Sequence, residues 1–173
     1  MSLAELRLDL ALTLDRVPQD SVDIVVRRLA SLANRIVGAP EMVERLGRPE
    51  RISEVEDRSL LAISGPYAIH HWSLQGMTRP VVAPAFSSDN LAVLKDAALA
   101  GLGLACIPLL ACHKEIEHGS LQLACEADEP NSSTLYAMTP SYRSTTSAVR
   151  TLIDHLRNCI ISSPAEGMRT TNS

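Results

Sequence analysis

The chain has 173 residues, of which 46% are apolar and 21% are charged, and its formal net charge at pH 7 is −4. This length and composition predict a globular chain that buries a substantial core. The negative charge argues against a basic nucleic-acid surface in this segment, and the 3% aromatic content leaves few platforms for stacking bases or sugars. The sequence contains no run of about 18 apolar residues, so we expect no membrane span.

The four cysteines follow neither the spacing of a disulfide framework nor that of a zinc-binding motif. A zinc site is therefore not favoured, and we expect no metal and no cofactor. The ligands considered for such a site are Cys106, Cys112, His113, His118 and Cys125. The first residues lack the basic region and apolar core of a secretory signal. These observations together predict reduced thiols in a cytoplasmic protein.

The N-terminal third reads as three strands and a short helix. Leucines alternate with other residues from Leu6 to Leu14, which is the period of a half-buried strand. Further strands are expected over residues 24–29 and 35–39. Residues 41–46 carry the signals of a short helix, because a proline precedes them and a glycine follows them.

The middle of the chain begins with an apolar strand over residues 59–63, which ends in the turn sequence Ser-Gly-Pro. A hairpin is expected next, with strands over residues 71–74 and 79–83 on either side of Gln75-Gly76. The adjacent histidines at 70 and 71 point to opposite sides of a strand, so they do not form one site.

The stretch from Ser87 to Pro108 predicts a capped helix followed by a buried strand. Ser87 or Ser88 is the expected N-cap, and Gly101 suits the left-handed position that ends a helix. The apolar residues 104–107 then form a strand that Pro108 terminates. The serine-rich N-terminus of such a helix is a ready site for a small anion.

The C-terminal part predicts two helices and two strands. A helix follows Pro108 and is closed by Gly119, and strands are expected over residues 121–125 and 135–138. The longest helix is predicted over residues 145–161, where apolar residues recur at helical spacing.

Polar connectors near residues 58 and 130 predict two lobes joined by two crossings. The first lobe would consist of residues 1–58 with 133–162, the second of residues 59–132, and residues 163–173 would be a disordered tail. A cleft between two α/β lobes is a usual place for a small ligand.

The order of these segments resembles the effector-binding domain of LysR-type transcriptional regulators. The strongest match runs from Asp89-Asn90 to Pro108, where a helix ends in Ala-Gly-Leu-Gly and an apolar strand closes with Ile-Pro. Gly119-Ser120-Leu121 and the segment Leu135 to Met138 continue the pattern in the family's order. The resemblance covers roughly residues 6–160 and implies a two-lobe α/β fold of the periplasmic-binding-protein type 2.

The resemblance also implies what precedes this segment in family members. We expect that the winged helix-turn-helix that binds DNA and the linker helix are absent from this segment, and that the first lobe lacks its initial strand, helix and strand. A strand without its neighbour exposes an edge that invites pairing. We therefore expect a homo-oligomer, and DNA contact only through the absent winged helix-turn-helix.

The implied function is sensing of a small metabolite, a carboxylate or an aromatic acid, between the two lobes, without catalysis. The residues expected to contact this effector lie at strand ends and at the helix N-terminus. They are Thr13, Ser64, Gly65, Ser87, Ser88, Asn90 and Pro108. A helix N-cap alone is the competing interpretation of Ser88. A transport-type solute-binding protein, or a small-molecule enzyme that uses the same cleft, remains the alternative function.

Overall fold

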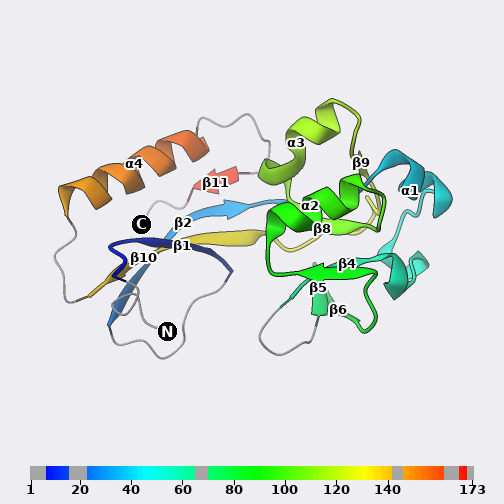
Figure 1. The fold of residues 1–173 in the computed structure, drawn as a ribbon, viewed down its shortest axis with the longest axis horizontal. Coiled ribbons are helices and arrows are strands. Elements are labelled where there is room, and N and C mark those ends of the chain that lie inside the picture. The colour runs from blue at the N-terminus through cyan, green and yellow to red at the C-terminus, as the bar shows by residue number, and fades with distance from the viewer. Residues whose placement is uncertain (1–6, 16–22, 65–69, 142–145, 162–167, 171–173) are drawn as a thin grey trace. The chain divides into compact units, whose positions relative to one another are not determined.

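The structure is a computed structural model that describes residues 7–15, 23–64, 70–141, 146–161 and 168–170 (Figure 1). The chain divides into two compact units. Unit 1 comprises residues 1–32 and 133–173, and unit 2 comprises residues 33–132. No helix in the described part of the chain is both long and apolar enough to span a membrane.

Unit 1 is an antiparallel sheet with a helix packed on it. The strand order is β1-β10-β2-β11; β10 pairs along its length with β2 and over Leu135–Met138 with β1. Helix α4 (Ser147–Ile161) places Val149 and Ile153 against Leu29 and Ala137 of the sheet. The strands are β1 (Ala11–Leu14), β2 (Ile24–Leu32), β10 (Ser133–Pro140) and β11 (Met168–Thr170).

Unit 2 is built on a layer of strands in the order β7-β4-β8-β3-β9. Strands β4 and β7 are parallel, and a parallel bridge between Leu60 and Leu104 joins β4 to β8. The backbone bonds from Leu61 to Leu104 and from Leu104 to Ser59, both 2.8 Å, hold this junction. The strands are β3 (Asn34–Gly38), β4 (Leu61–Ile63), β7 (Phe86–Ser88), β8 (Ala105–Pro108) and β9 (Gln122–Leu123).

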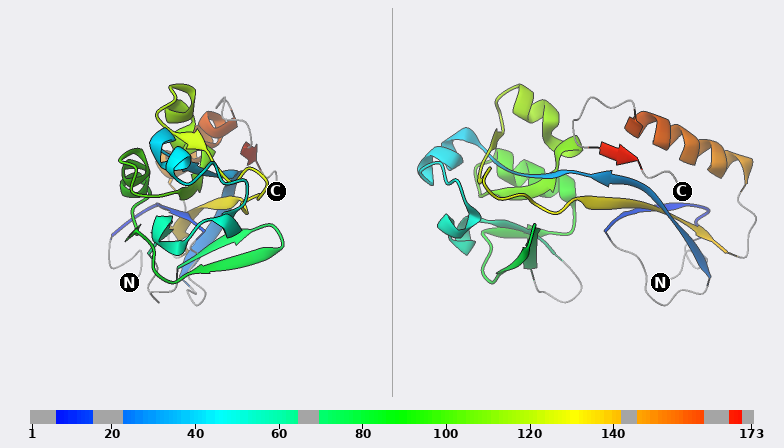
Figure 2. Two further views of the ribbon diagram at one scale, coloured as in Figure 1. Left: turned by 90° about the vertical axis from the view of Figure 1, so that its right-hand side faces the viewer. Right: turned by 180° about the vertical axis from the view of Figure 1, so that it is seen from behind.

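Both faces of this layer are covered, because consecutive strand residues point to opposite sides. Val37 and Leu61 pack against helices α2 (Leu91–Leu99) and α3 (Leu109–Glu117). Ile36 and Leu60 face the other core, which α1 (Pro40–Arg45), the single-turn helix η1 (Ile52–Glu54) and the hairpin β5–β6 complete. The hairpin strands are β5 (His70–Leu74) and β6 (Met77–Val81), which lie on the side of the layer away from α2 and α3 (Figure 2). Burial on both faces explains the nearly unbroken apolar runs in β4 and β8.

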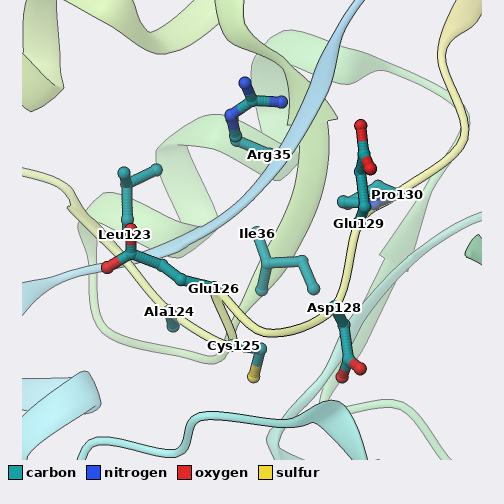
Figure 3. A pocket seen from close by; sticks show the side chains of 9 residues that line it. All are labelled: Arg35, Ile36, Leu123, Ala124, Cys125, Glu126, Asp128, Glu129 and Pro130. Atoms are coloured by element: carbon teal, nitrogen blue, oxygen red, sulfur yellow. The ribbon is translucent and has the colours of Figure 1, made fainter.

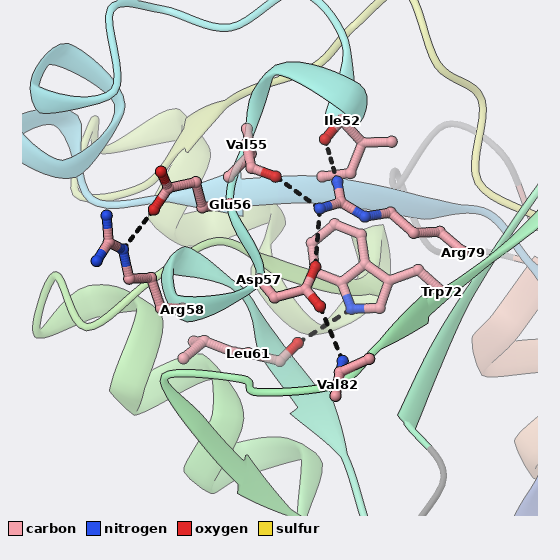
Figure 4. A network of polar contacts seen from close by, with 9 residues as sticks. All are labelled: Ile52, Val55, Glu56, Asp57, Arg58, Leu61, Trp72, Arg79 and Val82. Carbon is pink, nitrogen blue, oxygen red and sulfur yellow. Dashed lines mark hydrogen bonds and ion pairs between the residues drawn. The ribbon is translucent and has the colours of Figure 1, made fainter.

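Polar contacts fasten the hairpin to the rest of unit 2 (Figure 4). The buried Trp72 donates its indole N–H to the Leu61 carbonyl at 3.1 Å. The Arg79 guanidinium contacts Asp57 at 2.9 Å and donates to the carbonyls of Ile52 and Val55. The other carboxylate oxygen of Asp57 accepts the Val82 N–H at 2.8 Å. That backbone bond, together with Arg79, holds the pKa of Asp57 below its usual value.

Local sequence signals gave several elements correctly. The short helix after Pro40, the turn at Gln75-Gly76 and the helices α2 and α3 are confirmed. Gly101 has φ +70° directly after the C-cap of α2, as expected of a glycine that ends a helix. Gly103 serves packing instead, because a Cβ atom there would lie 2.7 Å from the Ser59 carbonyl oxygen.

Four expectations differ from the structure. The first unit boundary lies between Leu32 and Ala33 and not near residue 58, because β3 pairs with β8 and β9 and carries the following residues into unit 2. Residues 168–170, expected in a disordered tail, pair with β2 as β11. Residues 86–88 form β7, a strand that the sequence did not predict. The strand predicted from Leu6 to Leu14 is also shorter in the structure, because residues 7–10 are not part of a strand and β1 begins at Ala11.

Candidate functional site

The parallel strands of unit 2 bring several of the expected effector contacts to one edge of the layer. Ile63 pairs with Ser88 at the last positions of β4 and β7, and the Ser64 N–H donates to the Ser88 carbonyl at 3.0 Å. Asn90 lies two residues after Ser88 and is the N-cap of helix α2. We refer to Ser64, Ser88 and Asn90 as the polar edge. Side chains at the carboxyl ends of parallel strands are the usual ligand contacts of open α/β sheets.

The N-terminus of α2 is capped by Asn90 and not by Ser88, which corrects the predicted cap. The Asn90 Oδ1 atom accepts the Ala92 N–H at 2.9 Å. Ser88 bonds to the N-cap residue itself, since its Oγ atom accepts the Asn90 N–H at 3.1 Å. The hydroxyl hydrogen of Ser88 is not used in that bond. Asp89 is exposed, so its side chain is solvated beside the positive end of the helix dipole.

Ser87 and Pro108 have different surroundings from the polar edge. Ser87 is half-buried on β7 opposite Ala62, and its side chain points to the face opposite that of Ser88. Pro108 ends β8 and is fully buried, paired with Asn34. Its carbonyl accepts the Cys112 thiol at 3.6 Å in the first turn of α3. Pro108 therefore contributes shape to this end of the sheet and no side-chain polar group.

The remaining two candidates are not part of the polar edge. Thr13 lies in unit 1, half-buried on β1 opposite Tyr136. Thr13 and its partner Tyr136 point to the same face of the sheet. Ala137, the next residue along β10, points to the other face and packs under α4, so Thr13 is on the sheet face away from that helix. Gly65 lies outside the described residues.

A cavity that the sequence did not predict lies at the β3–β9 end of unit 2 (Figure 3). It has a volume of about 300 Å³, with Ile36 and Leu123 as apolar lining and Arg35, Glu126, Asp128 and Glu129 as charged lining. Asp128 is engaged, because it accepts the Ile52 N–H at 2.5 Å and lies 3.6 Å from the Arg51 guanidinium. The charge balance of this acidic cavity does not suit a carboxylate.

The thiols of Cys106, Cys112 and Cys125 are unreactive. Burial raises the pKa of Cys106 to about 12, that of Cys112 to about 11 and that of Cys125 to about 12. Thiols with such values are neutral at physiological pH and are poor nucleophiles. Within the described residues no group of three or more His, Cys, Asp or Glu side chains is arranged to hold a metal ion.

Sequence comparison matches this chain to one family model and to a transcriptional regulator. The profile of the LysR substrate binding domain matches residues 2–159. The HTH-type transcriptional regulator CrgA of Neisseria meningitidis is 24% identical over 123 residues, which are 70% of this chain and 40% of CrgA. The chain thus spans well under half the length of this curated relative.

Solved structures agree on the fold. The CrgA regulatory domain matches with a TM-score of 0.74 and 21% identity, covering 90% of this chain and 76% of that one. The AphB regulatory domain of Vibrio vulnificus gives 0.64 and 23%, covering 87% and 75%. The AmpR effector domain of Pseudomonas aeruginosa gives 0.66 and 16%, covering 91% and 76%.

These likenesses confirm the predicted α/β fold of the periplasmic-binding-protein type. The family profile covers most of the 173 residues, from residue 2 to the last turn of α4. The chain belongs to the LysR substrate-binding domain family.

Proposed function

We propose that the chain is the effector-sensing part of a LysR-type transcription regulator and that it binds a small metabolite carrying a carboxylate. The observation that carries this proposal is the polar edge, where two parallel strands and the N-terminus of α2 end together. The hydroxyl of Ser88 and the N–H groups of the first turn of α2, apart from that of Ala92, are hydrogen-bond donors at one place. The helix dipole favours a negative charge there.

The effector's other contacts follow from the sequence resemblance. Thr13, Gly65 and Ser87 would add polar or backbone contacts, and Pro108 would form part of the wall. The acidic cavity is a poorer candidate for this ligand, because its lining carries three carboxylates and one guanidinium. A carboxylate would meet repulsion in that cavity and attraction at the polar edge.

Signalling would require that the effector bind two states of the protein with different affinities. In this proposal the chain acts as a homo-oligomer in the cytoplasm and reaches DNA through a winged helix-turn-helix in another segment of the regulator. We expect no chemical turnover of the effector. The units are built as separate cores, so a change in their arrangement is the simplest change that binding could favour.

The test is thermal unfolding of the chain in the presence of small mono- and dicarboxylates and aromatic acids. At least one compound should raise the melting temperature, and Ser88→Ala should reduce that rise because it removes a hydroxyl donor from the polar edge. Ser120→Ala is the matched control. The Ser120 Oγ atom makes one local bond of 3.2 Å, to the Glu115 carbonyl near the C-terminal end of α3. Isothermal titration then gives the affinities of both variants.

Two outcomes contradict the proposal. In one, the folded chain is stabilised by none of the compounds. In the other, Ser88→Ala and Ser120→Ala bind the same compound equally well. Conversion of the bound compound to a product would show an enzyme instead of a sensor.

A further inference from the structure

One flank of α4, beside the face that packs on the sheet, carries an ordered row of exposed residues. Ala148, Leu152, His155 and Cys159 follow one another at spacings of four, three and four residues, and all are exposed. We call these residues the outer stripe. Leu152 keeps 46% of its surface exposed. This spacing is that of the contact positions of paired helices. The stripe that packs on the sheet is separate, with Val149 and Ile153 in the core of unit 1.

His155 and Cys159 within the outer stripe are already in contact. The Cys159 Sγ atom lies 3.4 Å from the His155 Nε2 atom, one helical turn away. Zinc binds thiolate sulfur at about 2.3 Å and imidazole nitrogen at about 2.0–2.1 Å, so two such ligands at a tetrahedral angle lie about 3.6 Å apart. The pair therefore has close to the separation that chelation of one zinc ion needs.

Cys159 also differs from the other cysteines of the chain. It is exposed, whereas Cys112 and Cys125 are buried and Cys106 is half-buried. Burial raises the pKa of those three thiols, which opposes the deprotonation that metal binding requires. Cys159 is thus the thiol that a metal ion reaches most readily.

One copy of the chain supplies only half of a site. Structural zinc is almost always bound by four protein ligands, and within the described residues no third His, Cys, Asp or Glu joins this pair. A two-fold axis beside α4 would bring a second His155 and Cys159 to the same ion. Such an axis gives a Cys₂His₂ set from two identical helices.

We propose that two copies of this chain bind one zinc ion between their α4 helices, through His155 and Cys159 of each. The two helices cross in antiparallel orientation about the segment 155–159, so that both ligand pairs meet at the axis. Each thiol releases its proton to solvent as the sulfur binds the ion, and each imidazole binds through the Nε2 lone pair. The exposed Leu152 is then buried in the helix pair, which adds apolar contact to the metal bonds.

The test uses the full chain with a phosphine reductant present, so that disulfides do not form. Zinc is titrated while sedimentation velocity records the mass of the assembly. The expected result is a doubling of the metal-free mass, saturating at one zinc ion for every two chains and reversed by a chelator. Cobalt(II) in place of zinc should give the sulfur-to-metal charge-transfer absorption and the visible bands of a tetrahedral site.

Variants assign the ligands. Cys159→Ser should abolish the charge-transfer absorption, and both Cys159→Ser and His155→Ala should abolish the doubling of mass. His118→Ala is the matched control, because His118 is an exposed histidine at the C-cap of α3. Circular dichroism checks that each variant folds, which is expected since both ligands are exposed on the helix.

The proposal is overturned by any of three results. Zinc binding that reaches one ion per chain without a change of mass excludes the shared site. Equal binding by the control and the two ligand variants excludes these residues. An assembly that resists the chelator and is split by reductant is a disulfide dimer through the thiol and not a zinc site.

Discussion

The two units of the chain bury their sheets in different ways. In unit 2 the layer of strands is covered on both faces, by α2 and α3 on one side and by α1 with the β5–β6 hairpin on the other. In unit 1 the described helix covers one face of an antiparallel sheet, and residues of the opposite face such as Thr13, Tyr136 and Met138 are half-buried.

This difference follows from strand direction. Parallel strands need crossover connections that lie on the faces of the sheet, so β4, β7 and β8 come with helices and loops that cover both sides. The antiparallel strands of unit 1 have no such requirement. The same difference explains why unit 2 carries the polar edge, since only parallel strands end side by side at one edge.

The comparison predicts that core truncation costs more in unit 2 than in unit 1. Leu104→Ala should lower the free energy of unfolding by about 4 kcal/mol, because the side chain is fully buried between two layers. Ile153→Ala in α4 should lower it by about 2 kcal/mol, the smaller end of the range for such substitutions.

Urea unfolding measures both effects. Trp72 is the only tryptophan and is buried in unit 2, so its fluorescence follows unit 2, whereas far-ultraviolet circular dichroism follows helices of both units. A larger loss for Ile153→Ala than for Leu104→Ala would contradict the comparison.

A second prediction concerns the contact between the residues just before β4 and those just before β8. Gly103→Ala should cost about 2 kcal/mol, because the new Cβ atom would lie 2.7 Å from the Ser59 carbonyl oxygen and force the backbone to shift. Gly101→Ala provides the control, since a Cβ atom there meets nothing within 4 Å and only the left-handed φ of +70° is strained. That strain costs about 1 kcal/mol. Urea midpoints followed by Trp72 fluorescence should rank the two variants, and the reverse order would show that the close approach at Gly103 is not tight.

The sequence predicted those elements whose signals are local. Helix α1 follows a proline and ends at a glycine, and the β5–β6 turn contains Gln75-Gly76, so neighbouring residues suffice to place them. Strand β7 carries no such signal. It has three residues, and it exists because it pairs with β4, which lies more than twenty positions earlier. The same holds for β11, which forms only by pairing with β2.

In the candidate site, too, the sequence predicted individual residues but not the long-range pairing that brings them together. Ser64, Ser88 and Asn90 were selected from sequence, and their common edge results from the β4–β7 pairing. The cap assignment failed because β7 extends through Ser88, so the helix starts later and Asn90 caps it. The acidic cavity was missed because residues 126–129 resemble a polar connector.

The boundary between units was placed wrongly for a related reason. Residues 33–58 show no change of composition at their start, and their place in unit 2 depends on long-range packing. Val55 and Ile52, for example, join the core that contains Trp72 and Leu104. Contacts of this kind cannot be inferred from the period of a single segment.

The last prediction concerns the polar contacts around Asp57 and Arg79 that stabilise unit 2. The pKa of Asp57 is lowered, chiefly by the bond from the Val82 N–H and also by Arg79, so its stabilising effect is present above the ordinary carboxyl pKa of about 4. It is lost as the pH falls through the lower pKa of the folded state, because the unfolded chain then binds the proton more readily.

Asp57→Asn should therefore reduce stability at pH 7 by about 1 kcal/mol, a modest loss for charged hydrogen bonds on a partly exposed side chain. The variant should also lose less stability than the parent chain between pH 5 and pH 3, since it has no carboxyl group to protonate at this position. Urea unfolding across this pH range, followed by Trp72 fluorescence, gives both values. Glu44→Gln is the control, because its ion pair with Arg48 is exposed on both sides and contributes little. If both variants kept the parent's dependence on pH, the network around Arg79 would not be what fastens the hairpin to unit 2.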